Sequence, residues 1–164
     1  MSTDFSVEKG ESNGLESVVI RSSTGESSTE ILLFGGTLVS WVCEGKERIF
    51  VSPDAIYNGK KAIRGGIPLV FPQFGQPEDV EGNLILPSLS QHGFARNSAW
   101  VLNKTSTTAD SGTVSLVLVE NEETLSVWPF PFRLEYFVTL SKDNITTDLR
   151  IANTGFPMCA FYNG

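Results

Sequence analysis

The residues that decide the fold class are Arg133–Leu140, Ser141–Asn144 and Ile145–Ala152, which read RLEYFVTL, SKDN and ITTDLRIA. In the first stretch every second residue from Leu134 to Leu140 is apolar, and this period of two predicts a strand. The SKDN segment is rich in turn-forming residues. A connection this short joins antiparallel neighbours. The three stretches therefore predict an antiparallel pair of strands.

Strand patterns continue on the N-terminal side of this pair. In Thr113–Glu120, the residues Val114, Leu116 and Leu118 share one face, while Val117 takes the other. Short segments of the same character, separated by turn-forming clusters, occur at Leu15–Ile20, Thr29–Phe34, Thr37–Cys43, Arg48–Val51 and Ser98–Asn103. Several strands are apolar on both faces and no amphipathic helix of convincing length is present. We therefore predict an all-β protein with an antiparallel two-sheet β-sandwich.

The predicted domain covers residues 15–164. Residues 1–14 are polar and rich in Gly, Ser and Glu, and we expect a flexible tail there. Residues 153–157 read as a turn, and a further apolar stretch, Met158–Tyr162, follows it. Its few residues before Gly164 resemble the beginning of a strand, so the predicted sandwich looks truncated and would present an unpaired edge.

Composition restricts the classes of partner. The 164 residues carry a formal net charge of −7, which disfavours nucleic acid and anionic membranes because both need a basic surface. Two cysteines and one histidine cannot build a structural zinc site. The first residues lack the pattern of a signal peptide, and no apolar run approaches the roughly 20 residues of a membrane span. We expect a cytoplasmic protein that binds neither nucleic acid nor membrane.

The segment from Ser52 to Asn97 is rich in Gly and Pro and shows no sustained period, which in an ordered protein is typical of a functional region. Two parts of it stand out. Lys60–Gly75 places cationic residues beside paired glycines, which allow the backbone to approach a ligand closely. Leu86–Asn97 combines an amide, an imidazole and a guanidinium around a glycine, and such groups suit sugar hydroxyls and an anion. The segment contains no P-loop, nucleophile elbow or dinucleotide fingerprint.

Each of these residues also has a simpler interpretation. Lys60 and Lys61 are more often solvated loop charges than ligands. The single histidine, His92, is as compatible with a structural hydrogen bond to the backbone as with a ligand role. Three aromatic rings of these segments are interpreted as core residues rather than as platforms for a sugar: Phe71, Phe74 and Phe94.

Taken together, the motifs resemble those of the glucose-6-phosphate 1-epimerases, or hexose-6-phosphate mutarotases, of the galactose mutarotase-like superfamily. The resemblance is carried by IRGGIP at 63–68, FPQFG at 71–75 and QHGFARN at 91–97, and it is supported by GGTLVSW at 35–41, WPFPF at 128–132 and NTG at 153–155. It implies a large antiparallel β-sandwich. It also implies interconversion of the α and β anomers of hexose 6-phosphates by acid/base ring opening, without metal or cofactor.

Site residues follow from the same resemblance. Arg64 and Arg96 match positions that hold the phosphate of glucose 6-phosphate or another hexose 6-phosphate. Gln91 matches a position that binds a sugar hydroxyl or orients the substrate, and His92 is expected in the pocket. The catalytic histidine and glutamate of such enzymes would lie beyond Gly164, so no catalytic residue is assigned here. The alternatives are a non-catalytic sugar-phosphate-binding module and an inactive fragment, and we expect a monomer.

Overall fold

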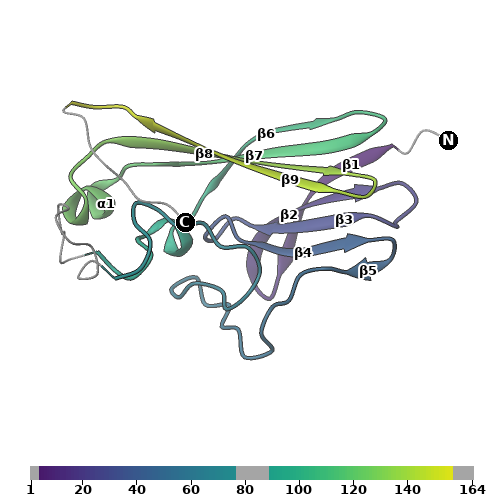
Figure 1. Cartoon of the computed structure of the whole chain (residues 1–164), viewed down its shortest axis with the longest axis horizontal. Coiled ribbons are helices and arrows are strands. Elements are labelled where there is room, and N and C mark those ends of the chain that lie inside the picture. Colours follow the sequence, from purple (N-terminus) through teal and green to yellow (C-terminus); the bar gives the residue numbers. More distant parts are fainter. Residues whose placement is uncertain (1–3, 77–88, 157–164) are drawn as a thin grey trace.

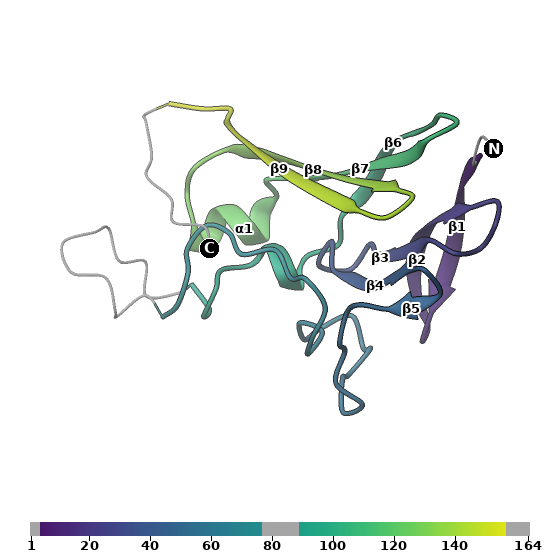
Figure 2. The same ribbon diagram turned by 45° about the vertical axis from the view of Figure 1, so that its right-hand side comes forward.

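The computed structural model describes residues 4–76 and 89–156, which form two antiparallel β-sheets packed face to face (Figures 1 and 2). The first sheet has the order β1-β2-β3-β4-β5, and the second has the order β6-β7-β8-β9. The strands of the first sheet are β1 (Phe5–Ser12), β2 (Leu15–Ser22), β3 (Ser28–Leu32), β4 (Leu38–Cys43) and β5 (Lys46–Glu47). The other elements are a 3₁₀ turn (Ala95–Asn97), β6 (Val101–Thr107), β7 (Ser111–Val119), the helix α1 (Glu122–Val127), β8 (Phe132–Ser141) and β9 (Ile145–Asn153).

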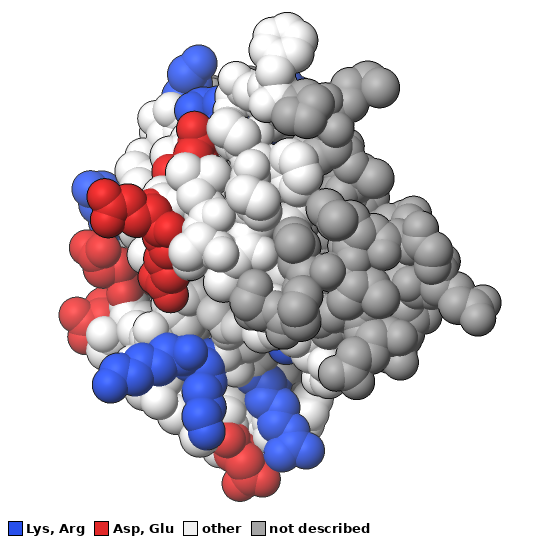
Figure 3. Space-filling view, turned by 90° about the vertical axis from the view of Figure 1, so that its left-hand side faces the viewer, with Lys and Arg blue, Asp and Glu red and all other residues white. Residues whose placement is uncertain are grey.

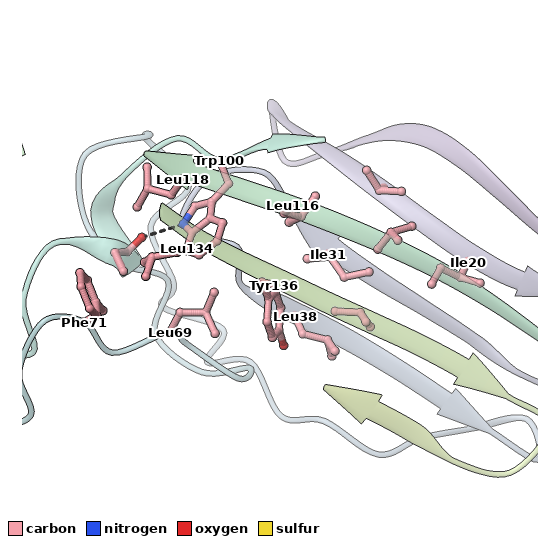
Figure 4. Close-up of a cluster of buried hydrophobic side chains, with 14 of the residues drawn as sticks. Ile20, Ile31, Leu38, Leu69, Phe71, Trp100, Leu116, Leu118, Leu134 and Tyr136 are labelled. Atoms are coloured by element: carbon pink, nitrogen blue, oxygen red, sulfur yellow. Dashed lines mark hydrogen bonds between the residues drawn. The ribbon is translucent and has the colours of Figure 1, made fainter. Parts of the chain in front are cut away.

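The hydrophobic core lies between the two sheets (Figure 4). In β8 every even-numbered residue from Phe132 to Leu140 is buried, as the period of two predicted. The first sheet contributes Ile20, Ile31 and Leu38 to the same cluster. Because burial of each such side chain contributes about 1.5–3 kcal/mol, this interlayer core dominates the stability of the sandwich. The predicted all-β antiparallel sandwich is confirmed.

The four-stranded meander agrees closely with the predicted strands. β7, β8 and β9 lie where the alternation placed them, and Val114, Leu116 and Leu118 are buried together. The strand predicted at Ser98–Asn103 is displaced, because β6 begins only at Val101. The short helix α1 begins after Asn121, whose side chain accepts the backbone N–H of Thr124 in a capping box. The strand-free character of Ser52–Asn97 is confirmed over its described residues, 52–76 and 89–97.

The strand predicted at Arg48–Val51 is absent. The carboxylate of Glu47 accepts the backbone N–H groups of Trp41, Arg48 and Ile49 at 2.9, 3.0 and 2.9 Å. The backbone N–H of Arg48 also donates to the carbonyl of Trp41 at 2.8 Å, whereas the N–H of Ile49 bonds to the carboxylate, and β5 is only two residues long.

The expectation of a flexible tail over residues 1–14 is wrong for most of that segment. β1 pairs with β2 from Phe5↔Ser22 to Ser12↔Leu15, and Phe5 is only 7% exposed in the core. The hairpin turn is Asn13-Gly14, with φ angles of 51° and 82°. Asn-Gly is a strong signal for a two-residue hairpin because both positions favour positive φ. The polar composition of the strand obscured that signal.

The apolar stretch predicted at Met158–Tyr162 lies outside the described residues. None of the helices in the described part of the chain is long and apolar enough to cross a membrane.

Candidate functional site

The two segments singled out in the Gly/Pro-rich region lie against each other. Phe71 and Gly93 form a parallel bridge, and the carbonyl of Phe71 accepts the backbone N–H groups of Phe94 at 3.0 Å and Ala95 at 3.3 Å. Gly93 has a φ of 71°, and a Cβ at this position would lie 2.1 Å from the carbonyl oxygen of Phe71. Only glycine permits this approach, which places the residues on either side of Gly93 at a fixed distance from the first segment.

His92 is fixed by hydrogen bonds between these two segments. The ring Nδ1 of His92 accepts the backbone N–H of Gly75 at 3.0 Å. The backbone N–H of His92 donates to the backbone carbonyl of Gly75 at 2.9 Å. An accepting Nδ1 leaves the proton of the neutral ring on Nε2, which makes no hydrogen bond within the described residues. Burial lowers the pKa of His92, and the nearby charge of Arg96 lowers this pKa further. His92 is therefore a neutral hydrogen-bond donor near pH 7.

Arg96 lies in the 3₁₀ turn and is half-buried. Its guanidinium donates to the backbone carbonyl of Gln91 at 2.8 Å, while its buried Nε has no partner among the described residues. Burial lowers the pKa of Arg96 without removing its charge at neutral pH. The carbonyl oxygen of Arg96 packs against Gly35, where a Cβ would lie 2.5 Å away. The turn between β3 and β4 thus packs against the backbone of Arg96.

Arg64 lies on a separate loop, and this loop packs against the start of β4. Its carbonyl accepts the backbone N–H of Ser52 at 2.9 Å, and its side chain is exposed. Two residues later, Gly66 approaches Leu38 so closely that a Cβ would lie 2.5 Å from the Leu38 carbonyl oxygen. Leu38 follows Gly35 by three residues, so Arg64 and Arg96 are both held by the region where β3 turns into β4. Within the described residues neither arginine forms an ion pair.

The arrangement joins three of the four predicted site residues directly. Gln91, His92 and Arg96 form one cluster, in which Gln91 supplies its carbonyl to Arg96 and has an exposed side chain. Arg64 belongs to the neighbouring loop rather than to this cluster. Figure 3 shows the face of the molecule on which Lys and Arg side chains gather in the lower part, apart from most of the Asp and Glu side chains. The cluster offers donors and positive charge, as an anionic polyhydroxy ligand requires.

Phe74 was assigned to the core from its residue type, and this is wrong. Phe71 is fully buried and Phe94 packs against the core, but the side chain of Phe74 is 60% exposed. Its ring centroid lies 4.9 Å from that of His92. The available signal was its position between Gln73 and Gly75 in a segment without alternation, where no buried face is defined. An exposed ring beside a donor imidazole can pack against the apolar face of a sugar.

In residues 4–76 and 89–156, no three His, Cys, Asp or Glu side chains gather closely enough to hold a metal ion.

The sequence profile described as aldose 1-epimerase matches residues 17–162 of this chain, and thus most of its length. The chain belongs to the aldose 1-epimerase family. Among curated family relatives, a "putative glucose-6-phosphate 1-epimerase" of Cenchrus ciliaris is 40% identical over 151 residues, which are 87% of this chain and 43% of the relative. A protein of Escherichia coli K12 with the same description is 37% identical over 103 residues, which are 62% of this chain and 33% of that protein.

Solved structures place the fold in the same group. A crystal structure described as a "putative mutarotase" from Salmonella typhimurium matches with a TM-score of 0.75 at 26% identity, covering 89% of this chain and 46% of that one. A galactose 1-epimerase from Lactobacillus acidophilus NCFM matches with a TM-score of 0.63 at 20% identity, covering 93% of this chain and 49% of that one. The aldose 1-epimerase fold is therefore shared, and the chain spans less than half the length of these relatives.

Proposed function

We propose that this chain supplies the sugar-phosphate-binding part of a hexose-6-phosphate mutarotase, with glucose 6-phosphate as the ligand. The observation that carries the proposal is the direct packing of the two glycine-rich segments, which brings His92, Arg96 and Phe74 to one cluster. The descriptions of the Cenchrus and Escherichia relatives as glucose-6-phosphate 1-epimerases support the same substrate class.

The roles follow from the chemistry of each group. Arg96 offers its guanidinium to the phosphate, because a planar fork of N–H donors matches phosphate oxygens. Arg64, whose exposed side chain extends from the neighbouring loop, adds the second positive charge. The Nε2 proton of His92 and the amide of Gln91 donate to sugar hydroxyls or the ring oxygen, and the Phe74 ring packs against the apolar C–H groups of the sugar.

Mutarotation needs more than these residues. Ring opening requires an acid that protonates the ring oxygen and a base that removes the anomeric hydroxyl proton. His92 is the single histidine of the sequence, and within the described residues no hydrogen bond or ion pair joins it to a carboxylate. We therefore assign binding to the cluster, and assign the acid and the base of the whole enzyme to other residues. The second candidate is a sugar-phosphate-binding module without catalysis, and it is favoured because His92 has no carboxylate partner among the described residues.

The binding proposal is tested by thermal unfolding of the purified chain with glucose 6-phosphate, glucose or inorganic phosphate. A ligand at 100 times its Kd adds about 2.7 kcal/mol to the free energy of unfolding. We expect the sugar phosphate to raise Tm most, and Arg96→Ala or Arg64→Ala to reduce the rise. Arg21→Ala is the matched control, since Arg21 lies exposed on β2 and belongs to neither segment. A rise that is equal in all four proteins, or none in the unmodified chain, contradicts the proposal.

Saturation-transfer NMR of glucose 6-phosphate anomers then separates the two candidates. Binding with exchange at the rate of a protein-free blank identifies the isolated chain as a binding module. Exchange above the blank that is lost with Arg96→Ala would show that a complete acid/base pair is present within the 164 residues.

A further inference from the structure

The indole ring of Trp100 links the core to the 3₁₀ turn that carries Arg96 (Figure 4). Its Nε1–H donates to the backbone carbonyl of Ala95 at 3.0 Å. This hydrogen bond is buried, since Trp100 is only 2% exposed and Ala95 is fully buried. Among the described residues, the other bond to this carbonyl comes from the backbone N–H of Ser98 and is longer, at 3.3 Å. The indole therefore makes the shorter bond to the residue that precedes Arg96.

The position of the indole is set by contacts with both sheets. The backbone N–H of Trp100 donates to the carbonyl of Leu33, just after β3, at 2.8 Å. The ring meets Tyr136 of β8 edge-on, with the centroids 6.4 Å apart. Gly36 leaves room for the ring, because a Cβ there would lie 3.4 Å from Cδ2 and Cε2 of Trp100. The indole N–H is thus held in one place between the two sheets.

The paired glycines at 35 and 36 take part in the same arrangement, and each has its own contact. Gly35 lies against the carbonyl oxygen of Arg96, and its backbone N–H donates to the carbonyl of Ser98 at 2.7 Å. Gly36 lies against the ring of Trp100. The two glycines therefore support both ends of the segment from Arg96 to Trp100.

The side chain of Arg96 depends on this backbone support. Within the described residues its guanidinium makes one hydrogen bond, to the carbonyl of Gln91 at 2.8 Å, and no ion pair. A single bond leaves a long side chain considerable freedom, so the place of the guanidinium follows mainly from where the turn lies. Holding the turn in advance lowers the entropy that an anion must remove on binding.

We propose that Trp100 is a positioning residue for Arg96: its indole N–H fixes the carbonyl of Ala95, and this fixes the place from which the guanidinium meets an anion. The inference rests on the proposed function, which takes that anion to be the phosphate of a sugar phosphate. Trp100 acts through the turn and does not touch the ligand. A tryptophan that only filled the core would need its ring but not this hydrogen bond.

An acid titration of His92 followed by NMR reports the place of Arg96 without any ligand. Burial and the charge of Arg96 both lower the pKa of His92. Trp100→Phe keeps an aromatic ring and removes the N–H. We expect it to raise the pKa of His92 toward the value found in Arg96→Gln, because a loosened guanidinium spends more time away from the imidazole. Trp41→Phe is the matched control and should leave this pKa unchanged, since the buried Nε1 of Trp41 has no partner among the described residues.

Gly36→Ala tests the same contact while the indole N–H is retained. The added Cβ would lie 3.4 Å from the ring of Trp100 and 2.8 Å from Cδ1 of Leu69, so the ring must shift. We expect a smaller rise in the pKa of His92. Gly25→Ala, at a φ of 74° with open space around it, controls for the backbone strain of Gly36→Ala at a φ of 58°. Circular dichroism verifies that each variant folds, and Gly36→Ala decides the matter if Trp100→Phe does not fold.

Calorimetric titration with glucose 6-phosphate separates this inference from the proposed function. Trp100→Phe should raise the Kd about threefold to tenfold, the range expected for the loss of one hydrogen bond. If the unmodified chain does not bind the sugar phosphate but the pKa of His92 rises in Trp100→Phe, the proposed function fails and the positioning of Arg96 stands.

Three results overturn the inference itself. The first is a pKa of His92 that stays the same in both Trp100→Phe and Gly36→Ala, whether or not the ligand binds. The second is a raised pKa with an unchanged Kd, because Arg96 would then bind equally well from a loosened turn. The third is an unchanged pKa in Arg96→Gln, because Arg96 would then not be held beside His92.

Discussion

The backbone N–H of Gly75 donates a 3.0 Å hydrogen bond to Nδ1 of His92, and the backbone N–H of His92 donates a 2.9 Å hydrogen bond to the carbonyl of Gly75. A protonated Nδ1 would place two donors face to face, so this pair stabilises the neutral ring with its proton on Nε2. The contact that joins the two glycine-rich segments therefore also favours the uncharged form of His92.

The first prediction concerns the pKa of His92. Burial and the charge of Arg96 both lower it, so the imidazole should titrate below 6.5. Arg96→Gln removes the nearby charge and should move the pKa upward. The chain has one histidine, so a single NMR signal followed through an acid titration measures it without assignment. A midpoint above 6.5 would contradict the structure, and Arg64→Gln controls for the loss of an arginine elsewhere in the region.

The lowered pKa also predicts a dependence of stability on pH. As pH falls below 6.5, the unfolded chain binds the proton before the folded chain does. The stabilising contribution is present above pH 6.5 and is lost as pH falls through the folded pKa. His92→Asn should remove this part of the acid slope, and Asn tolerates the positive φ of 65° at this position. Denaturant melts of both proteins between pH 7 and pH 5 test this. An unchanged slope would show that His92 does not contribute to it.

Phe74 and Phe71 should behave in opposite ways on truncation. Phe71→Ala removes a fully buried ring and should cost about 3–5 kcal/mol of the free energy of unfolding. Phe74→Ala removes an exposed ring and should change stability little, while weakening the Tm rise caused by glucose 6-phosphate. Phe74→Tyr keeps the aromatic face and should retain binding. If Phe74→Ala leaves the ligand response intact, the ring is not part of the sugar site.

Gly93→Ala should prevent the two glycine-rich segments from packing. The added Cβ would meet the carbonyl oxygen of Phe71 at 2.1 Å, so the segments must separate and the hydrogen bonds to Phe71 are lost. Gly25→Ala is a matched control, because Gly25 has a similar φ of 74° and open space around it. Its cost should be limited to the backbone strain of about 1–2 kcal/mol. Urea melts of the two variants measure the difference, and equal losses would contradict the close approach.

How much of this could be predicted from the sequence depends on how local each cause is. The alternation in β8 is local, and the structure follows it residue by residue. The carboxylate of Glu47 accepts the backbone N–H of Ile49 just after β5 and also that of Trp41 across a turn, and no period in the sequence encodes these bonds. β1 was obscured because only its first residues are apolar, and its pairing with β2 decides its conformation.

The candidate site divides in the same way. Gln91, His92 and Arg96 are neighbours in sequence and lie close together in the structure, and their role in binding stays a prediction. The exposure of Phe74 and the contact of Arg96 with Gly35 arise from segments distant in the chain. No pattern within either segment encodes those contacts.

The last prediction concerns Tyr136 at alkaline pH. Burial in the core raises the pKa of its hydroxyl to about 12 from the ordinary value of 10.0, although the nearby Thr147 side chain opposes the rise. Above pH 10 the unfolded chain therefore releases this proton while the folded chain retains it. Stability is full below pH 10 and falls as pH rises toward 12, by at most about 1.4 kcal/mol per pH unit.

Tyr136→Phe removes the titrating group, so the difference in unfolding free energy between the unmodified chain and Tyr136→Phe should change over this window. Tyr57→Phe makes the same chemical change outside the main core, where Tyr57 packs against the smaller cluster of Leu32, Val39 and Ile63. A difference between unmodified chain and Tyr136→Phe that is flat from pH 9 to pH 12 would show that the hydroxyl reaches solvent and that the sandwich is open beside β9.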